Sequence, residues 1–291
     1  MIVDTHVHVV SPDEERYPLC PAGIDQGTGA ERRPAAWYRD VPISTERLLE
    51  LMAATGVERA LLVQAMGAYS YDNRYAVDSA ARYPDRFSSV CIVDVEGEPQ
   101  PAATLRDLVE KRGARGVRLF TVTQPEGQWL DQPVAEPVWE CAASLGLPVV
   151  VTILARQIPK LVSVLRRFPA LPVALDHCGF PDLRGGSPYA RAQALFELAD
   201  LDNLRLKVTS LVLGQLLRAG DEPRAFVKYL AERFGAARLM WGSDYSQTHF
   251  RDYAGLVELG RDAASGLSSR DQEAFLGASA LEMWPELRAP R

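Results

Sequence analysis

The sequence predicts a single (β/α)8 barrel, and three observations carry that prediction. Short runs rich in Val, Ile and Leu recur along the whole chain, and each is followed by a longer segment with helical periodicity. The runs are almost continuously apolar instead of alternating, which is typical of parallel strands covered on both faces. The 291 residues suit one large α/β barrel or two modest domains, and the spacing of the units leaves no room for a second domain.

Eight apolar runs are predicted as strands, because each is short and rich in branched side chains. In chain order they are Ile2–His8, Ala60–Gln64, Ser89–Val93, Gly116–Phe120, Val149–Leu154, Val173–His177, Leu204–Thr209 and Leu239–Ser243. An open doubly wound sheet is the alternative fold, but it would carry a glycine-rich turn after its first strand. The residues Asp4–His8 are the opposite of glycine-rich, so the closed barrel is favoured.

The segments between the strands carry helix signals. Ser44 is predicted to cap a helix that ends at Gly56, because Leu48, Leu51 and Met52 share one face. Further helices are predicted at Ile158–Phe168, at Asp221–Gly235 with Pro223 near its start, and at roughly 72–83, 101–112, 132–145, 188–200, 252–264 and 270–280. Helices thus alternate with strands along the whole chain, as a barrel requires.

One segment departs from the alternation. Residues 11–43 follow the first strand and show no helical periodicity, and Ser11–Pro42 contains five prolines and three glycines. Long irregular loops in compact domains are usually functional. The sequence therefore predicts one domain over residues 1–291, with a lid-like loop above the catalytic end of the barrel.

Composition excludes several classes of function. The chain has 32 Lys and Arg against 38 Asp and Glu, for a net charge of −6, and no basic stripe for a nucleic acid. It has no apolar run long enough for a membrane span and no signal peptide at its start. We therefore expect a cytoplasmic protein with a small-molecule substrate. The four cysteines are widely spread and are expected to be reduced thiols.

Three histidines and one aspartate fall at the predicted ends of strands, where a barrel of this type places its active site. His6 and His8 are two residues apart, so alternation along the strand sends both to the same side. His177 ends the sixth strand and Asp244 follows the eighth. Asp176, one residue before His177, is expected to face the other way. Asp4 is expected to face the same side as His6 but to lie deeper, where a hydrogen-bonding role is favoured over catalysis.

In these residues the chain resembles the amidohydrolase superfamily, and specifically its lactonase-like branch of 2-pyrone-4,6-dicarboxylate and sugar lactonases. The motifs that carry the resemblance, in order, are His6-Val7-His8, Leu175-Asp176-His177-Cys178-Gly179-Phe180-Pro181, Leu206-Lys207-Val208-Thr209 and Arg238-Leu239-Met240-Trp241-Gly242-Ser243-Asp244-Tyr245. The resemblance implies a distorted (β/α)8 barrel and hydrolysis. It also implies that Asp244 is the base that activates water, with His6, His8 and His177 around it.

The resemblance also limits the metal chemistry. Members with two metals carry a carboxylated lysine or a glutamate on strand 4 and a histidine on strand 5, and neither is present here. A binuclear centre is therefore not expected. Two alternatives stay open: a single Zn²⁺ or Mn²⁺ on His6, His8, His177 and Asp244, or no required metal. Without a metal, the histidines would donate directly to the substrate oxygen. With one, the ion would act as the Lewis acid.

Positive charge near the predicted mouth suggests an anionic lactone as substrate. Arg118 ends the fourth strand, Arg156 follows the fifth, and Lys207 lies on the seventh. Arginine matches a carboxylate with a planar fork, although internal ion pairs explain Arg118 and Lys207 equally well. Tyr38 and Tyr69, from the loops after the first and second strands, complete the predicted substrate-binding set.

Two other functions compete with lactone hydrolysis. A metal-dependent decarboxylase of an aromatic or muconate-type acid would use the same barrel, but the missing strand-5 histidine counts against it. A barrel that only binds a ligand would have no need of a positioned base. The sequence is compatible with a homo-oligomer and does not decide the oligomeric state.

Overall fold

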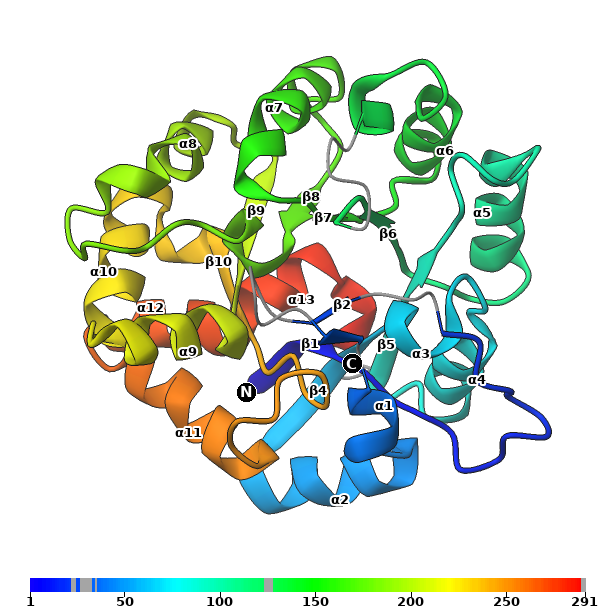
Figure 1. Ribbon diagram of the computed structural model, residues 1–291, viewed down its shortest axis with the longest axis horizontal. Helices are drawn as coiled ribbons and strands as arrows, with labels where there is room; N and C mark the ends of the chain where they lie inside the picture. Colours follow the sequence, from blue (N-terminus) through cyan, green and yellow to red (C-terminus); the bar gives the residue numbers. More distant parts are fainter. Residues whose placement is uncertain (22–24, 27–32, 35, 123–127, 289–291) are drawn as a thin grey trace.

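The computed structural model contains a parallel eight-stranded sheet that wraps into a barrel with helices outside it (Figure 1). Its strands, in the order in which they neighbour one another, are β1 (Ile2–Val7), β4 (Val57–Val63), β5 (Phe87–Ile92), β6 (Gly116–Phe120), β7 (Val149–Thr152), β8 (Val173–Leu175), β9 (Leu204–Thr209) and β10 (Leu239–Gly242). Each predicted strand is present, with ends that differ by up to three residues. The predicted barrel is confirmed.

The structure describes residues 1–21, 25–26, 33–34, 36–122 and 128–288. Part of the predicted lid-like loop therefore lies outside the described residues. The described part contains a two-stranded antiparallel pair, β2 (Asp25–Gln26) with β3 (Arg33–Pro34), and the short helix α1 (Trp37–Asp40). The sequence suggested that residues 11–43 are irregular throughout. The structure shows that they contain these short elements.

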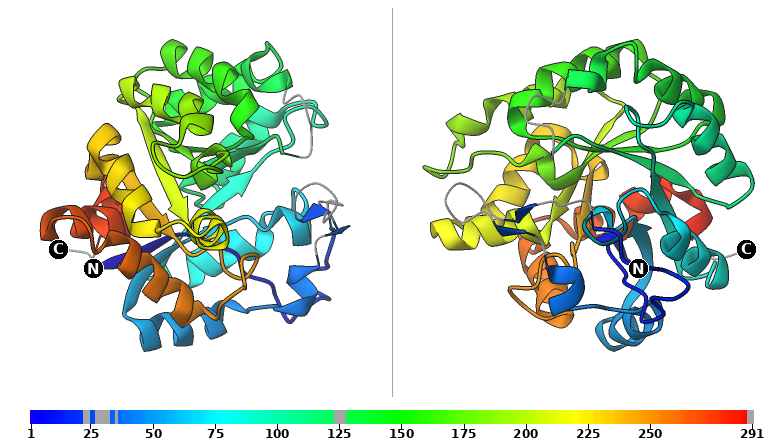
Figure 2. Two further views of the ribbon diagram at one scale, coloured as in Figure 1. Left: turned by 60° about the vertical axis from the view of Figure 1, so that its left-hand side comes forward. Right: turned by 45° about the vertical axis from the view of Figure 1, so that its right-hand side comes forward.

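The helices pack around the outside of the sheet, as the two further views show (Figure 2). They are α2 (Thr45–Thr55), α3 (Met66–Tyr69), α4 (Arg74–Arg82), α5 (Pro101–Glu110), α6 (Glu136–Leu145), α7 (Ile158–Arg167), α8 (Gln193–Phe196), α9 (Ser210–Ala219), α10 (Pro223–Phe234), α11 (Tyr253–Ala264), α12 (Ser269–Glu273) and α13 (Ser279–Met283). Ser44 accepts a hydrogen bond from the backbone N–H of Arg47, and Gly56 has a left-handed φ of 73°, so both predicted ends of α2 are confirmed.

Two helical segments differ from the prediction. Helix α9 was not predicted, because it starts directly after β9 with no loop and carries Gly214 in its middle. The predicted helix 188–200 is broken into α8 and flanking 3-10 turns. In both places the chain departs from the regular spacing of loop, helix and strand on which the prediction relied.

The barrel closes between β1 and β10 through backbone bonds at one end. The N–H of Asp244 donates to the carbonyl of His6, and the N–H of His8 donates to the carbonyl of Tyr245, both at 2.7 Å. Lower in the barrel, the hydroxyl of Thr5 donates to the carbonyl of Trp241 at 2.7 Å. The closure therefore fixes the segments that carry His6, His8 and Asp244 to one another.

Asp4 joins the same two strands to helix α11. Its Oδ1 accepts from the backbone N–H groups of Ser243, at 2.8 Å, and His6, at 3.1 Å, while its Oδ2 accepts from the hydroxyl of Tyr253 at 3.1 Å. The side chain is fully buried. Burial raises the pKa of Asp4 to about 6, and the hydrogen bonds from Ser243, His6 and Tyr253 only partly oppose that shift.

This raised pKa predicts a pH-dependent stability. The folded protein holds the proton of Asp4 more tightly than the unfolded chain does, so the stabilisation is complete below pH 3.8 and is lost as the pH rises through about 6. Asn at position 4 keeps the acceptor oxygen and removes the titration. We expect the free energy of unfolding of wild type, relative to Asp4→Asn, to fall by up to about 3 kcal/mol between pH 3.5 and pH 7.5.

Urea unfolding of the two proteins at intervals across this range measures the difference. A difference in free energy that stays constant with pH would contradict the prediction. Since Asp4→Asn changes one titrating group, the other carboxylates cancel in the comparison.

The opposite end of the barrel is filled by apolar side chains. Val3, Leu61, Val90, Val150 and Met240 point inward and pack against Trp284, in the segment after α13. The indole N–H of Trp284 donates to the carbonyl of Arg115 at 3.1 Å. In Figure 1 helix α13 lies across the centre of the barrel. This end offers no polar site, and barrels of this type place their active sites at the C-terminal ends of the strands.

No helix in the described part of the chain is both long and apolar enough to cross a membrane.

Candidate active site

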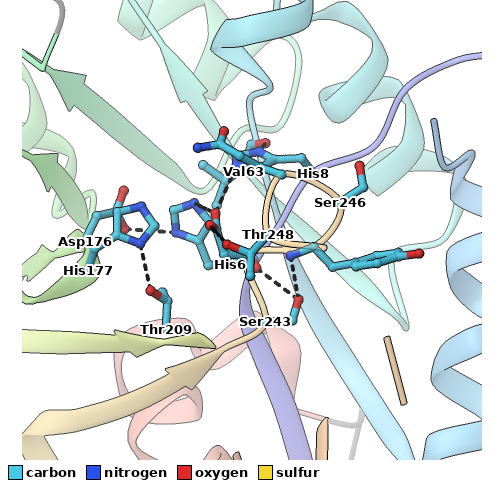
Figure 3. Close-up of polar contacts among 12 residues, drawn as sticks. His6, His8, Val63, Asp176, His177, Thr209, Ser243, Ser246 and Thr248 are labelled. Atoms are coloured by element: carbon cyan, nitrogen blue, oxygen red, sulfur yellow. Dashed lines mark hydrogen bonds and ion pairs between the residues drawn. The ribbon is translucent and has the colours of Figure 1, made fainter. Parts of the chain in front are cut away.

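His6 and His8 come from the end of β1 and point into the barrel (Figure 3). The pairing of β1 with β4 shifts register between Asp4 and Val7, so the strand is irregular where His6 lies. His8 follows the last residue of the strand and is held by its backbone bond to Tyr245. The shift explains why Asp4 faces α11 while His6, two residues later, faces the interior.

Three buried ligand atoms converge on one point. The Nε2 atom of His6 lies 3.5 Å from Oδ1 of Asp244, and Nε2 of His8 lies 3.6 Å from the same oxygen. Each side chain is at most 1% exposed. All three atoms lack a hydrogen-bond partner among the described residues. A buried polar atom without a partner is costly, so this convergence requires a functional explanation.

The opposite nitrogens of both imidazoles are occupied. Nδ1 of His6 lies 3.1 Å from Oδ1 of Asp176, and Nδ1 of His8 lies 2.9 Å from the carbonyl of Val63. Because both of these oxygens accept hydrogen bonds, each Nδ1 is assigned as the protonated nitrogen. The two Nε2 atoms then carry lone pairs, and both lone pairs face the carboxylate of Asp244.

Asp244 is held in place from its other oxygen. The hydroxyl of Thr248 donates to Oδ2 at 2.5 Å, and the backbone N–H of Thr248 donates to the carbonyl of Asp244 at 2.6 Å. Asp244 has φ of 56°, in the left-handed region that non-glycine residues rarely adopt. The turn after β10 is therefore bent to direct Oδ1 at the two histidines.

His177 reaches the site from a strained turn after β8. The strand ends at Leu175, and His177, Cys178, Gly179 and Phe180 all have positive φ, between 51° and 72°. Nδ1 of His177 lies 2.7 Å from the hydroxyl of Thr209, and its ring centroid lies 4.8 Å from that of His6 (Figure 3). The turn costs backbone energy and brings His177 beside His6.

The same turn contradicts the expectation that Asp176 faces away from the site. Its carboxylate is fully buried inside the barrel, with Oδ1 on His6. Oδ2 accepts from Thr152 at 2.7 Å and from Nε of Arg118 at 3.0 Å. Alternation no longer applies beyond Leu175, because the extended backbone ends there. Asp176 and His177 can therefore both face the interior.

Arg118 and Lys207 both pair with Asp176. Nζ of Lys207 lies 3.3 Å from Oδ1, and the side chain of Lys207 is fully buried. Arg118 uses only its Nε for Asp176 and Thr152, and its side chain is 5% exposed. One carboxylate thus faces two cations that come from separate strands. The internal ion pairs that the sequence left open are present.

Burial and charge set the protonation of the site. Burial lowers the pKa of His6 well below its ordinary value, and the positive charge of Lys207 adds to the effect against the opposing charge of Asp176. Burial also lowers the pKa of His177. Burial by itself raises the pKa of Asp176, but His6, Lys207 and Arg118 outweigh it and hold the pKa well below the usual range. His6 and His177 are therefore neutral, and Asp176 is ionised.

Asp244 is also ionised. Burial raises its pKa, but the neighbouring His177, His8 and His6 together hold the pKa well below the ordinary value. The Nε2 lone pairs of His6 and His8 and the ionised carboxylate of Asp244 together form a set of electron-pair donors.

This set fits one divalent cation. His6, His8 and Asp244 each offer one ligand atom, and these atoms lie within 4.8 Å of one another. Two neutral imidazole nitrogens and a carboxylate oxygen are ordinary ligands of Zn²⁺ and Mn²⁺. A cation bound there would satisfy all three of these buried atoms. His177 does not join this group of three and instead lies with His6 and Asp176.

The remaining predicted substrate residues lie less directly at the site. Tyr69 is buried, and its hydroxyl accepts from the N–H of Ser11 at 2.7 Å. Tyr38 is also buried, with its ring 5.9 Å from that of Trp37. Arg156 is exposed in the 3-10 turn Ala155–Gln157 after β7. None of these three has a described contact with His6, His8 or Asp244.

Four residues missed by the sequence prediction of the site complete it. Asp176, Thr209 and Thr248 hold His6, His177 and Asp244 respectively. The ring of Trp37 lies 5.4 Å from that of His8 and is buried. Thr209 and Thr248 had a signal, since one ends a strand and the other lies one helical turn after Asp244. Trp37 had none beyond its place in the loop.

His249 and Cys178 have no described contact with His6, His8 or Asp244. Nδ1 of His249 lies 3.0 Å from the carbonyls of Ser246 and Gln247, in the loop itself. Cys178 is buried, and burial raises the pKa of its thiol far above the ordinary value. The four cysteines are free thiols, and Cys20 is the exposed one.

The chain is similar to proteins of one known family. Residues 3–285 match a family model described as amidohydrolase. The chain is 31% identical over 227 residues to L-fucono-1,5-lactonase of Burkholderia ambifaria, which covers 75% of this chain and 76% of the relative.

Solved structures share the fold over the whole chain. A structure from Pseudomonas putida, described as a 2-pyrone-4,6-dicarboxylic acid hydrolase, is similar with a TM-score of 0.76 and 25% identity, covering 99% of this chain and 98% of that one. An amidohydrolase from Burkholderia multivorans with bound zinc is similar with a TM-score of 0.74 and 23% identity, covering 98% and 99% respectively.

Proposed function

The chain belongs to the amidohydrolase family, and from that premise we propose that it hydrolyses a small lactone with water activated by Asp244. The observation that carries the proposal is the buried, unpartnered Oδ1 of Asp244, which faces two imidazole nitrogens at the open end of the barrel. The lactonase relative from Burkholderia ambifaria supports the class of substrate.

The proposed reaction needs one base and stabilisation of an oxyanion. A water oxygen attacks the lactone carbonyl carbon while the carboxylate of Asp244 takes a proton from that water. The hydroxyl of Thr248 donates to Oδ2 and fixes the direction of this carboxylate. The ring C–O bond then breaks, and the departing oxygen takes the proton from Asp244. The products are a carboxylic acid and a hydroxyl group, and no covalent intermediate with the protein forms.

We propose that His6, His8 and Asp244 hold one divalent cation, Zn²⁺ or Mn²⁺. Bound there, it would supply Lewis-acid polarisation of the lactone carbonyl. Asp176 and Val63 fix the two imidazoles with their Nε2 atoms toward the site. Neither β6 nor β7 contains a carboxylate or a histidine, so the proposed centre holds one ion. His177 stays outside this set. We propose that it donates a hydrogen bond to the substrate oxygen.

Arg118 carries the proposal that the lactone is anionic. Its Nε is taken by Thr152 and Asp176, while its two terminal nitrogens make no hydrogen bond to the described residues. A guanidinium edge with both terminal nitrogens available matches a carboxylate.

We further propose that the chain acts as a single domain on a small molecule.

A panel of lactones tests the proposed function. Purified protein is assayed against neutral sugar lactones and carboxylated lactones of matched ring size, before and after dialysis against a chelator and after return of Zn²⁺ or Mn²⁺. We expect ring opening with higher kcat/KM for the carboxylated lactones, loss of most activity on chelation, and its recovery with one ion per chain.

The panel also contains the competing chemistry. Dihydroxybenzoate and muconate-type acids are included, with release of carbon dioxide as the readout. Decarboxylation without any lactone hydrolysis would overturn the proposal. Full activity after verified removal of metal would overturn the metal part alone, because the histidines would then act as direct donors to the substrate.

A further inference from the structure

We propose that Lys207 is a positioning residue, which acts through Asp176 to fix His6, instead of contacting the substrate. The proposal rests on the proposed function for its importance, but its evidence is the geometry beneath the site. The sequence left substrate binding and an internal ion pair open for Lys207, and the proposal chooses the second.

Lys207 lies on the closed side of the site. Its side chain is fully buried, and its Nζ lies 3.3 Å from Oδ1 of Asp176. The same nitrogen lies 5.7 Å from the centre of the Trp284 ring, which belongs to the apolar cluster at the closed end of the barrel. The ammonium group therefore lies between Asp176 and the barrel floor, and a substrate at the mouth has no path to it.

The partners of Asp176 divide between its two oxygens. Oδ2 accepts from Thr152 and Arg118, at 2.7 and 3.0 Å. Oδ1 faces His6 and Lys207, at 3.1 and 3.3 Å. Lys207 is therefore the group that holds Oδ1 from below while His6 donates to it from the site. Without Lys207, the only described partner of Oδ1 is His6 itself.

Stability alone does not account for a lysine at this position. One carboxylate faces two cations, so removing Lys207 leaves a neutral pair of Asp176 and Arg118. Nζ also has no hydrogen bond of good geometry among the described residues, and a buried ammonium is costly to desolvate. An apolar side chain of the same length would satisfy the fold, which points to a role at the carboxylate.

Two measurements on the intact protein test the proposal without any substrate. The first is the ¹⁵N spectrum of the imidazoles in the metal-free protein, which resolves the protonated nitrogen of each of the four histidines. In wild type we expect His6 to carry its proton on Nδ1. The second is the affinity for Zn²⁺, measured by competition with a chromophoric chelator.

The variants are Lys207→Met, which keeps the length of the side chain, and Lys207→Gln, which keeps a polar end if the Met variant does not fold. Arg205→Met is the matched control. Arg205 lies two residues earlier on the same face of β9, and its charge pairs with Glu282, 3.7 Å away, instead of Asp176. It tests the loss of a long cation from the same strand.

We expect the Lys207 variants to weaken Zn²⁺ binding by about 10–100-fold, the range for residues that orient a metal ligand. Their His6 signal should change to a mixture of tautomers, and Arg205→Met should change neither property. Two results would overturn the proposal. One is a wild-type His6 protonated on Nε2, and the other is a Lys207 variant with unchanged Zn²⁺ affinity and tautomer but a raised KM. If no lactone is hydrolysed, these readouts still decide the role of Lys207.

Discussion

Replacing Asp244 by Asn is expected to lower kcat for lactone hydrolysis by about 10³-fold, within the range of about 10²–10⁴ for the loss of a general base. Asn has the same shape and can still accept from Thr248, so the turn after β10 keeps its main side-chain contact. What it lacks is a carboxylate that can take a proton from water. The amide group would also weaken metal binding, because it is neutral.

Steady-state kinetics at saturating Zn²⁺ or Mn²⁺ separates the loss of the base from the loss of the ion. We expect the deficit in kcat to persist when the metal content is restored. Asp252→Asn is the matched control, since Asp252 lies in the same loop and caps α11 by accepting from the N–H of Gly255 at 2.8 Å. Asn caps a helix as well as Asp does, so this variant should keep wild-type kcat.

A kcat for Asp244→Asn within threefold of wild type would overturn the role of Asp244 as base. In that case His177 would be the next candidate. It is buried with its pKa lowered, mainly by burial, and a neutral imidazole can accept a proton from water.

The strands could be predicted from sequence because their side chains are buried on both sides. In β6, Gly116–Phe120, and in β9, Leu204–Thr209, the apolar runs and the observed strands coincide. His6 and His8 could be predicted as a pair because both lie at a strand end, and barrels place such side chains at the mouth. Polar residues at the end of an apolar run stand out from their surroundings, so local pattern is enough to find them.

The partners of Asp176 could not be predicted, because alternation fails at the end of β8. The left-handed turn that contains His177 and Cys178 rotates both Asp176 and His177 inward. Non-glycine residues rarely adopt positive φ, and nothing in the local sequence requires it. The structure therefore reveals the shared carboxylate that explains why Arg118 and Lys207 occur on separate strands.

The register shift in β1 had a similar effect on Asp4. Simple alternation places Asp4 on the same side as His6, yet its carboxylate binds Ser243 and Tyr253 on the outer side of the closure. The expectation that Asp4 acts through hydrogen bonds agrees with these contacts, but its direction was wrong. A bulge depends on how neighbouring strands pair, which no single strand's sequence determines.

Replacing Asp176 by Asn is expected to destabilise the fold by about 3–5 kcal/mol, the usual result of removing one partner from a buried ion pair. The variant leaves Arg118 and Lys207 as two uncompensated cations, of which Lys207 is fully buried. Asn also offers only one oxygen in place of the two that Thr152, Arg118, His6 and Lys207 share.

Urea unfolding of the metal-free protein measures this loss, and a half-buried carboxylate at the surface provides the control. Asp182 also pairs with two arginines, Arg184 and Arg191, each at 2.7 Å, but at the surface. Asp182→Asn should cost less than about 1 kcal/mol, because water screens and replaces exposed ion pairs. The two variants remove the same charge, with the same number of cationic partners, in different surroundings.

A double variant tests whether uncompensated charge is the cause. Lys207→Met in the background of Asp176→Asn removes one of the two stranded cations, so the double variant should be more stable than Asp176→Asn alone. In the wild-type background the same change leaves the neutral pair of Asp176 and Arg118 and should alter stability little. This non-additivity is the signature of a direct interaction. Additive effects would mean that Asp176 stabilises the barrel through its hydrogen bonds to Thr152 and His6 and not through charge.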